Sequence, residues 1–364
     1  MFMVSRSLWY GCPCRWRAEM QFAWLKDIGL PVLVIIATVT LGFQKIIRSA
    51  APGRELKVTL VQPSIPQTLI WNPKEDATRF TRLLELSKRA LADKPDLLVW
   101  PEAAMPSVFG DVEFYPVITN LAQTHRTWLL LGADDVERRV KSAAGVETRY
   151  YNSSFLVNPA GEAVASYRKR QLVIFGEYVP LVRWLPFMKY LTPIGSGFTS
   201  GDRPVPFKMT EPHATLAVLI CFEDTFPHLA REYVQDETDL LVNLTNNGWF
   251  GDSAAQWQHA ANAVFRAVEN GVPLVRCGNN GLTCWVDAQG RMRQIYGLEA
   301  KNVYREGFMT ANIPLLAAGE KRERTFYNRH GDWFGWSCVG LAAMMLVLRL
   351  RSKRSVCIPP GTVW

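Results

Sequence analysis

The chain has 364 residues, 48% hydrophobic and 20% charged, a composition that excludes an intrinsically disordered protein. Its net charge of +8 lies mostly at the two ends, since residues 1–27 carry +2 and residues 349–364 carry +4. Because the rest of the chain has no basic stripe, we expect no nucleic-acid partner. The seven cysteines are scattered and match no zinc or disulfide pattern, so no metal site or disulfide framework is predicted.

The first predicted element is an apolar segment at residues 28–48. Its charge-free part, "IGLPVLVIIATVTLGF", approaches the roughly 20 residues that cross a bilayer as a helix, which predicts a membrane anchor. A cleaved signal peptide is the alternative, with "SAA" at 49–51 as the cleavage site. Lys45 and Arg48 lie between the apolar run and that site, and this favours the anchor.

Residues 56–325 are predicted to form one α/β domain, because strand-like and helix-like segments alternate there. The turn "PAGE" joins two strand-like runs into a hairpin, so the sheet is not purely parallel. The last predicted helix places Trp257, Ala261, Val264 and Val268 on one apolar face. The predicted strands are 56–62, 96–100, 127–133, 150–158, 163–169, 214–221, 239–246, 272–278, 282–291 and 307–313, and the predicted helices are 75–92, 113–125 and 254–270.

The second apolar segment, residues 333–350, predicts a membrane helix that opens with two tryptophans. The basic tail at 351–364 is expected to stay in the cytoplasm, because positive residues beside a span tend to remain there. With both chain ends inside, the α/β domain would lie on the far side of the membrane. A buried amphipathic helix is the alternative for this segment.

Cys221 ends an apolar strand and is followed by two acidic residues, Glu223 and Asp224. One interpretation is a buried core thiol, since free cysteine is among the most buried residue types. A nucleophile is the other, but neighbouring carboxylates raise the pKa of a thiol. A nucleophilic Cys221 would therefore need a base and a positive charge from elsewhere in the chain.

Two residues at other strand ends can supply that base and that charge. Glu102 directly follows the strand 96–100, and Lys169 ends the return strand of the hairpin. Ligands of α/β sheets bind beyond the carboxyl ends of strands, so Glu102 is a candidate general base and Lys169 a candidate stabiliser of negative charge. Taken singly, Glu102 is equally well a solvated loop acid, and a basic cluster such as that around Lys169 is usually a solvated face. No histidine lies in a comparable context for a Cys–His pair.

The three segments, in this order, resemble the catalytic motifs of the nitrilase (carbon–nitrogen hydrolase) superfamily. They read "VWPEAAMP", "YRKRQLVIFGEYVP" and "LICFEDTFP". "NNGWFG", the "QH" that follows it and "YNRHGDW" are similar to the apolipoprotein N-acyltransferase branch of that superfamily. The resemblance covers about residues 56–348. It implies a four-layer αββα sandwich with one N-terminal and one C-terminal transmembrane helix here, where that branch usually has several N-terminal spans.

The resemblance implies that Cys221 is the nucleophile, Glu102 the general base and Lys169 the oxyanion stabiliser, with Glu177 and Glu223 in supporting roles. If Cys221 and Glu223 lie in an extended segment, they point to the same side. Asp224 is expected to be structural. No cofactor is implied.

The implied reaction moves an acyl chain from a membrane phospholipid, through a Cys221 thioester, to the α-amine of a diacylglyceryl-modified apolipoprotein. The implied location is the bacterial inner membrane, with the catalytic domain on the periplasmic side and a separate subunit as one source of further spans. The apolar stretch 172–198 contributes candidate lid or lipid contacts, with Phe175, Tyr178, Trp184 and Trp249 as the candidates. The alternatives are a membrane-anchored amidase and an inactive lipoprotein-binding scaffold.

Overall fold

The computed structural model describes residues 13–47 and 53–354, except 71, 106, 142–144, 182–183, 186, 189–196 and 318. The chain divides into two units at Ala51 and Pro52. The first unit contains one long helix, α1 (Pro13–Ile47). The second contains the sheets, their covering helices and the last helix, α8 (Trp333–Arg354).

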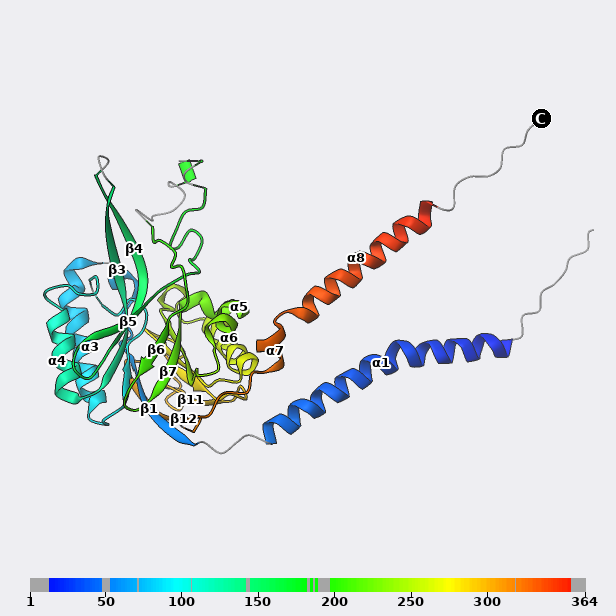
Figure 1. Ribbon diagram of the computed structural model, residues 1–364, viewed down its shortest axis with the longest axis horizontal. Coiled ribbons are helices and arrows are strands. Elements are labelled where there is room, and N and C mark those ends of the chain that lie inside the picture. The colour runs from blue at the N-terminus through cyan, green and yellow to red at the C-terminus, as the bar shows by residue number, and fades with distance from the viewer. Residues whose placement is uncertain are drawn as a thin grey trace, which may run out of the picture. The chain divides into compact units, whose positions relative to one another are not determined.

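The second unit is built on two six-stranded mixed sheets (Figure 1). In the first sheet the neighbouring strands are β12-β1-β2-β3-β4-β5, and in the second they are β11-β10-β9-β8-β7-β6. The strands of the first sheet are β1 (Arg54–Gln62), β2 (Leu97–Val99), β3 (Trp128–Lys141), β4 (Gly145–Val157), β5 (Ala163–Arg168) and β12 (Gly307–Leu315). Those of the second are β6 (Pro206–Met209), β7 (Ala214–Ile220), β8 (Leu240–Thr245), β9 (Leu274–Gly278), β10 (Cys284–Val286) and β11 (Met292–Ile295).

Parallel strands occupy the centre of each sheet and antiparallel strands its edges. The strands β1, β2 and β3 run parallel, as do β7, β8 and β9. Loops that follow β2 and β7 therefore leave the carboxyl ends of parallel strands, where α/β folds place their ligands.

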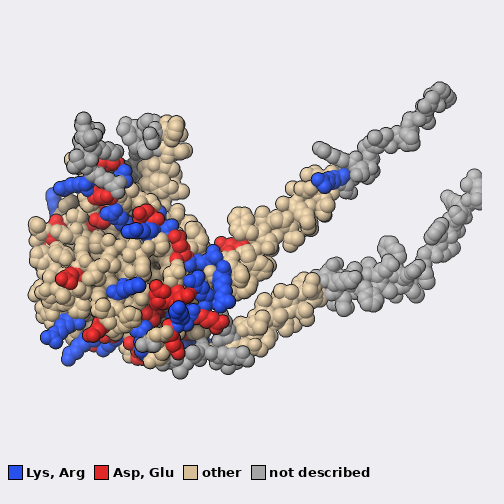
Figure 2. Space-filling model, viewed as in Figure 1, with Lys and Arg blue, Asp and Glu red and all other residues tan. Residues whose placement is uncertain are grey.

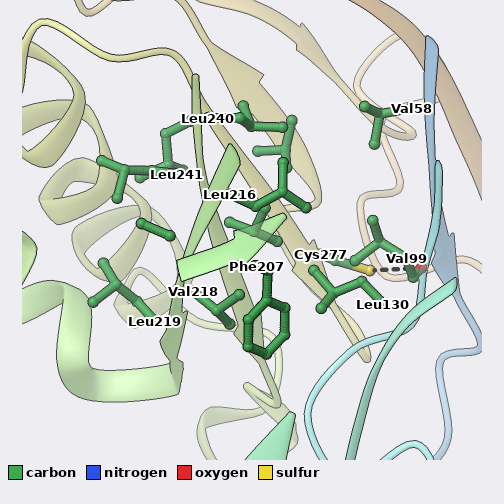
Figure 3. Packing of buried hydrophobic residues seen from close by; sticks show 14 of the residues in the cluster. Val58, Val99, Leu130, Phe207, Leu216, Val218, Leu219, Leu240, Leu241 and Cys277 are labelled. Atoms are coloured by element: carbon green, nitrogen blue, oxygen red, sulfur yellow. Dashed lines mark hydrogen bonds between the residues drawn. The ribbon is translucent and has the colours of Figure 1, made fainter. Parts of the chain in front are cut away.

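The main core lies between the two sheets. Alternate side chains of the first sheet, such as Val58 and Leu130, pack with Leu216, Val218 and Leu240 of the second (Figure 3). Cys277 belongs to this core, and its thiol donates to the carbonyl oxygen of Val99 at 3.3 Å. Cys277 and Cys284 are both buried free thiols, so the two cysteines do not pair.

Helices cover the outer faces of both sheets and complete four layers. The outer face of the first sheet packs against α3 (Asp76–Leu91) and α4 (Tyr115–His125) through a second apolar cluster. The second sheet is covered by α5 (Pro227–Tyr233) and α6 (Ala255–Asn270). The predicted α/β fold with two mixed sheets is confirmed, and the strand predicted at 214–221 ends one residue earlier than expected.

The residues predicted to share one face of α6 do so, and most of that face turns outward. Trp257 and Val268 are each 46% exposed, whereas Gln256, His259 and Arg266 on the opposite face are buried. These polar side chains bond to loops that follow β7 and β8, so hydrogen bonding and not the hydrophobic pattern decides which face of the helix turns inward.

Helix α8 contains a stretch, Trp333–Arg351, that is long and apolar enough to cross a membrane, and none of it is buried. Figure 2 shows almost no charged side chains along this helix until the basic residues near its end. The apolar part of α1, Ile28–Gln44, is shorter. By length and composition, the second predicted span is thus better supported than the first. A short helix, α7 (Phe326–His330), joins α8 to the α/β domain.

Candidate active site

Cys221 lies at a sharp bend directly after β7. Ile220 is fully buried at the strand end, whereas Cys221 is half-buried and has a φ of +53°. A positive φ is uncommon for a residue with a side chain and is often found at functional sites. Cys221 also begins a one-turn 3-10 helix, η4 (Cys221–Thr225). The expectation of an extended segment, with Cys221 and Glu223 pointing to one side, is therefore wrong.

Glu102 is held in the loop after β2 by one donor from the middle of β4 and one from the loop after β8. Its Oε1 accepts from Asn152 Nδ2 at 2.8 Å, and its Oε2 accepts from the backbone N–H of Asn246 at 2.9 Å. Gly132 of β3 passes directly beneath, since a Cβ there would lie only 2.8 Å from the Cα of Glu102. A glycine at this position lets the loop approach the sheet and brings the carboxylate toward β4 and β5.

Lys169 follows β5 and bridges two carboxylates. Its Nζ donates to Glu102 Oε1 at 3.2 Å and to Glu177 Oε1 at 2.8 Å, and its side chain is only 1% exposed. Asn152 Nδ2 also donates to Glu177, at 2.9 Å, and the backbone N–H of Val173 donates to the other oxygen. An ammonium group has three donors, so one N–H of Lys169 is left for a further acceptor.

Glu102, Lys169, Glu177 and Asn152 are called the front cluster below, and its charges act on the Cys221 thiol. Burial, together with the negative charge of Glu102, raises the pKa of Cys221 to about 12, although Lys169 opposes this shift. Burial alone would lower the pKa of Lys169, but Glu102, Cys221 and Glu177 raise it above its ordinary value. At neutral pH the resting pair is thus a neutral thiol beside an ammonium group.

Asp134 is a further acid on the same side of the first sheet. It lies directly opposite Asn152 in the β3–β4 register, and two residues along β3 from Gly132, so its side chain shares their face. Burial and the charges of Glu102 and Glu177 raise its pKa to about 7. The sequence offered no reason to single out this residue, because an Asp in a long hairpin is usually solvated.

A second group of polar residues holds the backbone of Cys221 from behind. The carbonyl oxygen of Cys221 accepts from Asn243 Nδ2 at 3.0 Å, and His259 Nε2 lies 3.3 Å from it. The same ring nitrogen lies 2.8 Å from Asp224 Oδ1, and Arg276 donates to the other oxygen of Asp224 at 2.7 Å. These four buried residues, Asn243, His259, Asp224 and Arg276, are called the back cluster. Asp224 makes buried contacts with His259 and Arg276, as expected of a structural residue.

Glu223 is fully buried beneath the bend. It was expected to point to the same side as Cys221, but it is directed away from the front cluster. Its Oε1 accepts from the hydroxyl of Tyr167 and from the backbone N–H of Arg170, both at 2.7 Å. Its Oε2 accepts from the N–H of Ile220 at 2.8 Å. Glu223 therefore ties the end of β7 to the segment that carries Lys169, and this fixes the two strand ends relative to each other.

The predicted lid candidates differ in exposure. Trp184 is 80% exposed, Trp249 64% and Phe175 44%, and Tyr178 is half-buried. The turn at 173–178 presents Glu177 inward and Phe175 outward, with Phe175 at a φ of +60°. Residues 182–183, 186 and 189–196 of the 172–198 stretch lie outside the described residues.

Sequence reasoning missed the amides and the histidine that hold the site together. Asn152 lies inside a strand, where polar residues are usually solvent-facing, and His259 lacks a nearby motif partner. A signal was present in "NLTNNG" after β8, because three asparagines at one strand end are unusual. Among the described residues, no group of His, Cys, Asp or Glu is arranged to hold a metal ion.

Comparison with known proteins agrees with this architecture. The chain matches the carbon-nitrogen hydrolase family over residues 57–321. It is 37% identical over 331 residues to an apolipoprotein N-acyltransferase of Geobacter metallireducens, covering 90% of this chain and 60% of the relative. A second apolipoprotein N-acyltransferase, from Chlorobaculum tepidum, is 31% identical over 350 residues and is covered to 63%. The chain thus spans about three-fifths of the length of these relatives.

Among solved structures, an amidase from Nesterenkonia sp. superposes with a TM-score of 0.51 at 17% sequence identity, covering 78% of this chain and 98% of the amidase. This likeness shows a shared fold. One conclusion follows from the motif order, from the two mixed sheets and from the family match over most of the α/β domain. The chain belongs to the carbon–nitrogen hydrolase family.

Proposed function

We propose that this chain is an apolipoprotein N-acyltransferase that uses Cys221 as nucleophile, Glu102 as general base and Lys169 as oxyanion stabiliser. The observation that carries the proposal is the buried Lys169, which contacts Glu102 and Glu177 and whose charge acts on the Cys221 thiol. The names of the relatives support acyl transfer over amide hydrolysis. We also propose transmembrane helices at 28–48 and 333–350, on either side of a catalytic domain at 56–325.

In the first half-reaction, the sulfur of Cys221 attacks the ester carbonyl carbon of a phospholipid acyl chain. Because the resting thiol is protonated, its proton passes to Glu102 as the carbon–sulfur bond forms. The remaining N–H of Lys169 donates to the oxyanion. Collapse breaks the ester carbon–oxygen bond, and the departing lysophospholipid oxygen takes the proton from Glu102.

In the second half-reaction, the neutral α-amine of a diacylglyceryl-modified N-terminal cysteine attacks the thioester. Glu102 accepts a proton from the amine, the carbon–sulfur bond breaks, and Cys221 recovers its proton. A thioester suits this sequence because it is reactive toward amines and divides one difficult transfer into two easier ones. Glu177 shares Lys169 and Asn152 with Glu102, and so orients both of them for the two steps.

Exposed aromatic side chains in the segments that follow β5 and β8 suggest how lipid reaches the site. Phe175, Trp184 and Trp249 are all at least 44% exposed, and aromatic side chains insert readily at the boundary between headgroups and acyl chains. We propose that these residues contact the acyl donor in the bacterial inner membrane, with the catalytic domain on the periplasmic side.

The test uses the full chain in proteoliposomes that contain phospholipid with a labelled acyl chain. The proposal predicts transfer of label to a synthetic diacylglyceryl-modified lipopeptide, and loss of that transfer in Cys221→Ala. Hydrolysis of short amides without labelling of the lipopeptide would instead identify an amidase. Transfer that persists in Cys221→Ala would remove Cys221 from the mechanism.

A further inference from the structure

Helix α6 turns an apolar, uncharged face away from the domain. Trp257, Ala261, Phe265 and Val268 lie at successive helical spacings, and all four are exposed, Phe265 to 60%. A helix on the surface of a water-soluble domain normally shows charged residues on this face. The apolar face of α6 therefore calls for an apolar neighbour.

The charged residues of α6 are directed away from this face. The helix has only two, Arg266 and Glu269, which pair with each other at 2.8 Å. Arg266 is 4% exposed and also donates to the carbonyl oxygen of Asp224. No charge of α6 is thus left to interrupt the apolar face along its length.

One end of this apolar face lies beside the candidate active site, and the other end lies beside the segment that leads into α8. At the first end, His259 of α6 lies against the carbonyl oxygen of Cys221, and exposed Trp249 and Phe250 precede the helix. At the other end, Asn270 of α6 accepts from Asn328 of α7 at 2.8 Å. Figure 1 shows α7 leading from this end of the domain into α8.

Aromatic residues mark the junction with α8. Phe326 of α7 is 61% exposed, and its ring packs edge-on against Trp333, the first residue of α8, with centroids 5.7 Å apart. Tryptophan and other aromatic side chains concentrate where a membrane helix meets the headgroup region. A membrane entered by α8 at Trp333 would place its headgroup level at the C-terminal end of α6, where the apolar face of α6 ends.

We propose that the outward face of α6, formed by Trp257, Ala261, Phe265 and Val268, lies in the lipid interface of the membrane that α8 enters. An uncharged apolar helix face of this kind binds a bilayer at the boundary between headgroups and acyl chains. Binding along α6 keeps the bend at Cys221 close to the membrane surface. This inference needs membrane attachment and does not depend on acyl transfer.

Photocrosslinking from the full chain in phospholipid vesicles tests the contact. The photoreactive p-benzoylphenylalanine replaces Phe265 in one variant and Val112 in the control. Val112 is 91% exposed and precedes α4, which covers the opposite outer face of the domain. Both positions tolerate a bulky side chain because they face outward.

We expect lipid adducts, identified by the mass of the modified peptide, severalfold more often from position 265 than from position 112. Equal yields from the two positions would overturn the proposal. Adducts from position 265 to polypeptide in place of lipid would also overturn it and would identify α6 as a protein-binding face. Because crosslinking requires no turnover, an enzyme that fails to transfer acyl chains can still support or refute this contact.

Discussion

The front cluster and the back cluster both place buried charges near Cys221, but they contact different parts of that residue. The front cluster acts on the thiol, and its Lys169 keeps one donor free after binding Glu102 and Glu177. The back cluster bonds to the carbonyl oxygen of Cys221 through Asn243 and His259. Similar residue types thus act on the thiol on one side and hold the backbone on the other.

The two clusters differ in whether their polar groups are accessible to a substrate. Asp224 and Arg276 are fully buried and make their contacts within the protein. Glu177 and Cys221 are both partly exposed, so the front cluster adjoins the solvent-accessible side of the bend. Substitutions in the front cluster should therefore remove the chemical step, whereas substitutions in the back cluster should displace the nucleophile and reduce the rate less.

Removing the cation of the front cluster has the largest expected effect. Lys169→Met should lower the rate of acyl transfer about 100- to 1000-fold, because the oxyanion loses a preorganised donor. It should also lower the melting temperature, since Glu102 and Glu177 lose their shared cation. The exposed Lys208→Met serves as the matched control and should leave both quantities unchanged. Transfer in Lys169→Met within threefold of the control would contradict this role for the front cluster.

Substitution in the back cluster should have a smaller effect on rate. His259→Ala should reduce kcat about tenfold with little change in KM, because the bend that presents Cys221 shifts while the lipid contacts stay. His259→Gln keeps a donor in reach of Asp224 and should recover part of the loss. Steady-state kinetics on the lipopeptide separates the two parameters. Equal losses in both variants, or a change confined to KM, would mean that His259 does not act through the backbone of Cys221.

Asp134 beside the front cluster should affect stability more than rate. Its pKa in the folded state, about 7, lies above the ordinary 3.8, so folding favours the protonated form. The stability associated with the neutral acid is fully present below pH 3.8 and is lost as the pH rises through 7. Asp134→Asn should accordingly stabilise the protein by about 4 kcal/mol at pH 8 and have little effect at pH 4. Melting temperatures at the two pH values measure this, and equal shifts at both would exclude titration of Asp134 as the cause.

The sequence predicted the elements and the front cluster better than the back cluster. Strand and helix periodicity located most elements of the α/β domain, and strand ends pointed to Glu102, Lys169 and Cys221. These residues carry charge or a thiol in distinctive motifs, and the geometry brings them to one place. The short edge strand β6 was missed because its four residues lie in a proline-rich stretch with little periodicity.

The errors arose where tertiary hydrogen bonds overrode a local pattern. Alternation predicted an extended segment at Cys221, but the hydrogen bonds of Glu223 to Ile220 and to the segment after β5 stabilise a tight turn there. Hydrophobic spacing grouped Trp257 with other apolar residues on one face of α6, but the polar partners of His259 and Arg266 turn the other face toward the core. Apart from the local bond between Glu223 and Ile220, these contacts join segments more than 30 residues apart and leave no local signature in sequence.

The central claim is that Cys221 rests as a neutral thiol and gives its proton to Glu102 during attack. The most direct test compares Glu102→Gln with the unmodified chain in two assays, acyl transfer and the rate of iodoacetamide alkylation at Cys221, resolved by peptide mass. Because the charge of Glu102 raises the thiol pKa, its removal should increase alkylation at pH 8 while acyl transfer falls about 100-fold or more. A parallel fall in both rates would contradict the claim, since it would mean that Glu102 already holds the proton of Cys221 before substrate binds.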